Sequence, residues 1–84
     1  MDYKDISTEL ETLGYYCYQK NGVLFSGIKG DTGPIEGTFV LNSTFSIKLL
    51  NEITISYLVG QISTEKEFKT IDELLKFVRQ VFPI

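Results

Sequence analysis

Residues 70–82 read TIDELLKFVRQVF, and they decide the structure of the C-terminal part of the chain. Thr70 and Glu73 match the T-x-x-E capping box of a helix N-terminus, and Pro83 ends the pattern. Apolar side chains recur on one stripe at helical spacing, at Ile71, Leu74, Leu75, Val78 and Phe82. The stretch therefore predicts a helix over residues 70–82 that packs into a core, with its central contacts made by Leu74, Leu75 and Val78.

A second helix is predicted over residues 2–13, at the other end of the chain. Its apolar side chains lie three and four residues apart, at Tyr3, Ile6, Leu10 and Leu13. Asp2 is suited to the N-cap position, and Gly14 to the residue that follows a helix C-terminus. The sequence therefore predicts one amphipathic helix near each end of residues 1–84.

From Tyr15 the period changes from helical to two, which predicts a β-hairpin. Asn21-Gly22 favours a two-residue type I′ turn, in which Lys20 pairs with Val23 and Tyr18 with Phe25. Two sets of side chains then point to opposite faces. One face carries Tyr16, Tyr18, Val23 and Phe25, and the other carries Tyr15, Cys17, Leu24 and Ile28.

The stretch from Thr38 to Gly60 alternates again, after a turn-rich loop over residues 30–37. Breaks near Asn42-Ser43 and Asn51-Glu52 divide it into strands, and residues 61–67 are expected to be a charged connection that could prolong the last one. Because the connections are short, the strands form an antiparallel meander. The sequence predicts one two-layer α+β domain over residues 1–84, with a sheet of about five strands and both helices on one face.

Composition and charge narrow the classes of function. A net charge of −3 with scattered Lys and Arg disfavours binding to nucleic acid or to a membrane. The single cysteine, Cys17, cannot form an internal disulfide, so a reducing, cytoplasmic location is expected. The chain lacks His, Trp and Ala and uses Lys for seven of its eight basic residues, which is typical of AT-rich coding in some bacteria and phages.

No cofactor site, metal site or catalytic site is predicted. With no His and one Cys, the chain lacks the usual transition-metal ligands and the base that would activate a Cys17 nucleophile. The tripeptide Asp31-Thr32-Gly33 resembles the catalytic tripeptide of aspartic proteases, but its Gly, Asp and Pro surroundings predict a turn. The sequence therefore indicates a protein that is not an enzyme.

The first hairpin is the candidate binding site, because both of its faces are apolar. Whichever face meets the helices, the other presents large apolar side chains to a protein partner or to a second copy of the chain. The candidates are Tyr15, Tyr16, Tyr18, Leu24, Phe25 and Ile28. The alternative for this surface is that the 30–37 loop or the Pro83-Ile84 tail covers it.

We interpret the chain as a small protein-binding or dimerising module, of the kind found among bacterial or phage accessory proteins. The second interpretation is an acidic inhibitor that imitates nucleic-acid charge and blocks a DNA- or RNA-handling enzyme. That inhibitor would need a continuous acidic strip, for which the C-terminal candidates are Glu65, Glu67, Asp72 and Glu73.

Overall fold

The computed structural model describes residues 2–32 and 39–84. Its elements, in chain order, are α1 (Tyr3–Thr12), β1 (Tyr16–Lys20), β2 (Val23–Thr32), β3 (Phe39–Leu49), β4 (Ile53–Val59), β5 (Ile62–Phe68) and α2 (Ile71–Val81). The predicted order of helix, strands and helix is confirmed.

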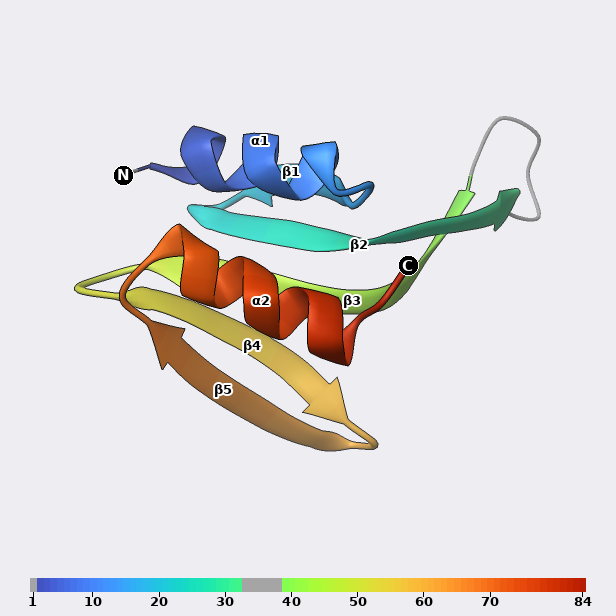
Figure 1. The fold of residues 1–84 in the computed structure, drawn as a ribbon. Helices are drawn as coiled ribbons and strands as arrows, with labels where there is room; N and C mark the ends of the chain where they lie inside the picture. Colours follow the sequence, from blue (N-terminus) through green and yellow to red (C-terminus); the bar gives the residue numbers. More distant parts are fainter. Residues whose placement is uncertain (1, 33–38) are drawn as a thin grey trace.

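The five strands form one antiparallel meander in the order β1-β2-β3-β4-β5. Both helices lie on the same side of this sheet, α1 beside β1 and α2 across the middle strands (Figure 1). We call the sheet face under the helices the inner face, and the opposite one the outer face. The fold is the predicted two-layer α+β arrangement. Neither helix is long and apolar enough to span a membrane in the part of the chain that is described.

Local sequence explains where both helices begin and end. Asp2 caps α1 in a complete capping box with Asp5, and Gly14 follows the helix with a φ of 105° that suits glycine. Thr70 caps α2 by accepting the backbone N–H of Glu73. In a capping box, the Glu73 side chain would accept the backbone N–H of Thr70. Here the Glu73 carboxylate accepts a hydrogen bond from the Thr70 hydroxyl instead.

The core lies between the inner face and the two helices. Its fully buried centre combines residues from α1, from the sheet and from α2, including Ile6, Leu10, Ile47, Ile55, Leu74 and Val78. Aromatic rings continue the core along the sheet, in the order Tyr15, Phe45, Phe82, Tyr57, Phe77 and Phe68, with successive ring centroids 4.8–5.9 Å apart. Leu75, predicted as a central contact, is only half-buried, because it lies at the margin of the helix stripe.

Three strand boundaries differ from the prediction. Asn42-Ser43 does not end a strand, because Ser43 adopts a φ of 50° inside β3 and inserts one extra residue opposite β2 as a bulge. Residues 62–68 are not a connection but the edge strand β5, which pairs with β4 along its whole length. Asp31 and Thr32 belong to β2 rather than to a loop, whereas the rest of the expected 30–37 loop lies outside the described residues.

Candidate functional site

The orientation of the first hairpin determines which candidate residues are accessible. Tyr15 and Leu24 are buried in the core, and Ile28 is half-buried against it. These three side chains hold the hairpin on the inner face and offer no docking surface. Tyr16, Tyr18 and Phe25 lie on the outer face, so the prediction of a partner-binding hairpin now concerns these three residues.

The rings of Tyr16, Tyr18 and Phe25 form one cluster on the outer face, which we call the ring cluster. Tyr18 stacks on Phe25 with a centroid distance of 5.3 Å, and Tyr16 lies 6.2 Å from Tyr18 in a tilted arrangement. Tyr16 remains 38% exposed and Tyr18 42% exposed. Aromatic rings held side by side and open to solvent are typical of the centre of a protein interface.

The hairpin that carries the ring cluster is held in place at its turn. At its turn, Asn21 and Gly22 both have positive φ, and the pairs Lys20–Val23, Tyr18–Phe25 and Tyr16–Gly27 match the predicted type I′ register. The Tyr3 hydroxyl of α1 donates to the Gly22 carbonyl at 2.7 Å and accepts the Leu49 N–H at 3.0 Å. One hydroxyl therefore joins α1, the hairpin turn and the end of β3.

Cys17 and Ser26 form a hydrogen-bonded pair on the inner face of the hairpin. The Ser26 hydroxyl donates to the Tyr16 carbonyl at 3.0 Å, and the Cys17 sulfur lies 3.3 Å from the same hydroxyl oxygen. Burial raises the pKa of the Cys17 thiol, against the lowering effect of the Ser26 hydrogen bond. The thiol is therefore protonated at neutral pH, which favours a packing role over a nucleophilic one.

Short hydroxyl side chains cover the middle of the outer face. Thr44, Ser46 and Ser56 line a hollow of about 240 Å³, together with Phe25, Leu58 and other residues. Leu58 is 67% exposed. Leu58 was not predicted to be a surface residue, although it is the apolar position that follows Thr54 and Ser56 on that face of β4.

Charge on the outer face changes from one sheet edge to the other. Lys20 lies at the β1 edge, whereas Glu65 and Glu67 lie at the β5 edge, opposite Ser56 and Thr54 of β4. Lys66 points to the inner face, where its Nζ lies 5.3 Å from the centre of the Phe77 ring. Asp72 and Glu73 belong to α2 in the other layer, so the four acidic candidates do not share one face.

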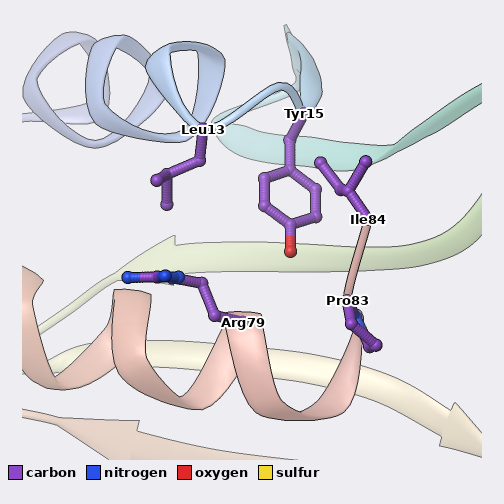
Figure 2. Close-up of a pocket in the computed structure, with 5 residues that line it drawn as sticks. All are labelled: Leu13, Tyr15, Arg79, Pro83 and Ile84. Carbon is purple, nitrogen blue, oxygen red and sulfur yellow. The ribbon is translucent and has the colours of Figure 1, made fainter.

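A pocket of about 340 Å³ opens on the helix side, between the end of α1 and the end of α2. Figure 2 shows the Tyr15 ring pointing toward α2 between Arg79 and the Pro83-Ile84 tail. The Tyr15 hydroxyl donates to the Phe82 carbonyl, where it satisfies the C-terminal end of α2. Burial raises the pKa of Tyr15, and the Arg79 charge lowers it in part. The Tyr15 hydroxyl in this pocket therefore has a structural role, because its proton is already donated to a backbone carbonyl.

The Pro83-Ile84 tail, one of the two alternative covers for the hairpin, lies against this pocket. A Cβ placed on Gly14 would come within 3.1 Å of the Ile84 side chain, which puts the tail on the helix side and away from the ring cluster. Residues 33–38 of the other expected cover lie outside the described residues. Within the described ranges, no three His, Cys, Asp or Glu side chains are grouped to hold a metal ion. No family model, curated protein or solved structure matches this chain.

Proposed function

We propose that this domain is a non-enzymatic, cytoplasmic protein-binding or self-associating module that docks through the outer face of its sheet. The observation that carries this proposal is the ring cluster on the face opposite both helices, in which Tyr16 and Tyr18 are exposed and Phe25 is half-buried. Isolated exposed apolar residues are ordinary, but three adjacent rings on a rigid hairpin are the kind of anchor that interfaces use.

The rigidity of the hairpin supports this proposal. Loops that bind partners often lose entropy on ordering, whereas the ring cluster is already held by the type I′ turn, the β2 pairing and the Tyr3 bridge. The pocket beside Tyr15 supports an enzymatic function less well. Its Tyr15 hydroxyl is already hydrogen-bonded to the Phe82 carbonyl. Acid–base catalysis would need another side chain in the pocket that can exchange a proton with a substrate.

Site-specific photo-crosslinking in cells of the source organism tests the proposal. A photoreactive phenylalanine derivative at position 18 should form discrete protein adducts, because Tyr18 lies in the ring cluster. The same photoreactive derivative at position 19 is the matched control. Gln19 is also exposed on β1, but its side chain points to the opposite side of the strand from Tyr18. Adducts at position 18 that are absent at position 19 support the function, and equal or absent crosslinking at both positions overturns it.

A further inference from the structure

We propose that the occupant of the outer face is a second copy of this chain, bound face to face, with β1 of each copy lying across from β5 of the other. This inference rests on the proposed function and specifies its partner. The arrangement requires a two-fold axis that runs parallel to the strands and over β3, the central strand. Rotation about that axis keeps positions along the strands and exchanges the two sheet edges.

The strand register shows which residues would meet. Residues that pair across the sheet form rows on the outer face, and the rotation places each row on itself in reverse order. The first row is Lys20, Val23, Lys48, Thr54 and Glu67. The second is Tyr18, Phe25, Ser46, Ser56 and Glu65. The third lies beside the β2–β3 bulge: it contains the pairs Tyr16–Gly27 and Leu58–Ser63, with Thr44 of β3 next to Gly27.

Charge is complementary in this arrangement at both sheet edges. Lys20 faces Glu67 of the second copy, and by symmetry Glu67 faces Lys20, so the interface contains this ion pair twice. The Tyr18 hydroxyl faces the Glu65 carboxylate, which is a hydrogen-bond acceptor. One edge of the face carries rings and Lys20, and the other edge carries carboxylates. Two such faces are complementary only when the β1 edge of one copy meets the β5 edge of the other.

Shape is complementary in the middle of the face. Phe25 of one copy comes to lie over Ser56 of the other, above the hollow lined by Thr44, Ser46 and Ser56. Leu58 comes to lie over Gly27, the position in its row that has no side chain. The large apolar side chains of Phe25 on β2 and Leu58 on β4 thus face small residues. Sheets stacked about 10 Å apart need this alternation of large and small side chains to interdigitate.

The position of Lys48 provides a specific test of this arrangement. It lies on β3, in the row of Lys20 and Glu67, so the axis places the Lys48 side chains of the two copies near one another. Two like charges in one interface weaken it. Removal of this charge should therefore strengthen self-association. A dimer in which the two Lys48 side chains lie far apart would not be strengthened by this change.

Sedimentation equilibrium of the purified full chain tests the inference. The wild type should show a concentration-dependent dimer that weakens as salt is raised, because its edge ion pairs are screened. Lys20→Glu and Glu67→Lys should each weaken the dimer by about tenfold or more, since each change affects two symmetry-related pairs, and the double variant should recover most of the loss. Lys48→Ser should tighten it. Lys4→Glu, on the exposed surface of α1, is the matched charge-reversal control and should leave the dimer unchanged.

Circular dichroism melts of every variant exclude loss of folding as the cause of a weaker dimer. A wild type that stays monomeric at millimolar concentration overturns the inference, as does a dimer that the Lys20 and Glu67 reversals weaken without recovery in the double variant. Neither result affects the photo-crosslinking test. Adducts at position 18 to a different protein, together with a monomeric purified chain, would uphold the proposed function while removing the second copy as the partner.

Discussion

The two faces of the sheet are built from the same five strands but differ in what surrounds them. On the inner face, buried aliphatic side chains and a continuous series of rings fill the space under α1 and α2. On the outer face, hydroxyl side chains occupy the middle, rings occupy the β1–β2 side and carboxylates occupy β5. Packing against the helices explains the buried side chains of the inner face. The Ser and Thr side chains are typical of a solvated outer face, whereas the ring cluster and Leu58 are large apolar groups on that face.

Truncation of one phenylalanine on each face should give the largest difference between them. Phe45 is buried between the Tyr15 and Phe82 rings, so Phe45→Ala should destabilise the domain by about 3–5 kcal/mol. Phe25 is half-buried on the outer face, and Phe25→Ala should cost roughly 1 kcal/mol. Urea unfolding at low protein concentration measures both values. Equal losses would show that the outer face contributes to folding as much as the inner one.

The turn at Asn21-Gly22 determines which hairpin residues belong to each face, because a one-residue slip would exchange them. Gly22 has a φ of 73°, and Gly22→Val should cost about 1–3 kcal/mol, because a β-branched side chain is strained there. Among the described residues, no atom outside the two chain neighbours lies within 4 Å of a Cβ at this position, so the loss reflects backbone strain rather than a clash. Gly22→Asn is the control and should cost less, since Asn tolerates positive φ. A valine variant as stable as the asparagine variant would contradict this explanation.

Local signals made much of the fold predictable from the sequence. The helix stripes, the Asp2 and Thr70 caps and the type I′ turn each depend on residues close together in the chain, and all are found in the structure. Two of the boundary errors have clear physical causes. Ser43 takes positive φ in a bulge, so a polar pair resembled a turn, and β5 is an edge strand whose charged residues resembled a connection.

The candidate site was predictable only in part, because it depends on pairing between distant strands. The two-sided apolar hairpin was visible in the sequence, but both of its faces are apolar, so periodicity could not show that Tyr15 and Leu24 point inward. The charge difference across the outer face was not visible at all. Glu65 and Glu67 join that face only through the pairing of β5 with β4.

Tyr15 offers a smaller test of the inner face, since it lies three residues from Tyr18 but on the opposite side of the hairpin. Tyr15→Phe keeps the ring against Phe45 and removes the hydrogen bond from its hydroxyl to the Phe82 carbonyl. The expected loss at neutral pH is about 0.5–1.5 kcal/mol, the usual net contribution of one hydrogen bond. Thermal melts of the wild type and the variant at pH 7 measure it.

The stability difference between wild type and Tyr15→Phe should shrink as the solution becomes alkaline. Burial raises the pKa of Tyr15 in the folded state, so the unfolded chain loses this proton first, near the usual pKa of about 10. The stabilisation from the protonated hydroxyl is therefore fully present below that value and is lost as pH rises through the higher folded pKa. The variant has no such group, so paired melts from pH 7 to about 11 should converge. A difference that stays constant over this range would show that the Tyr15 hydroxyl is solvated, and that the inner face does not close over it.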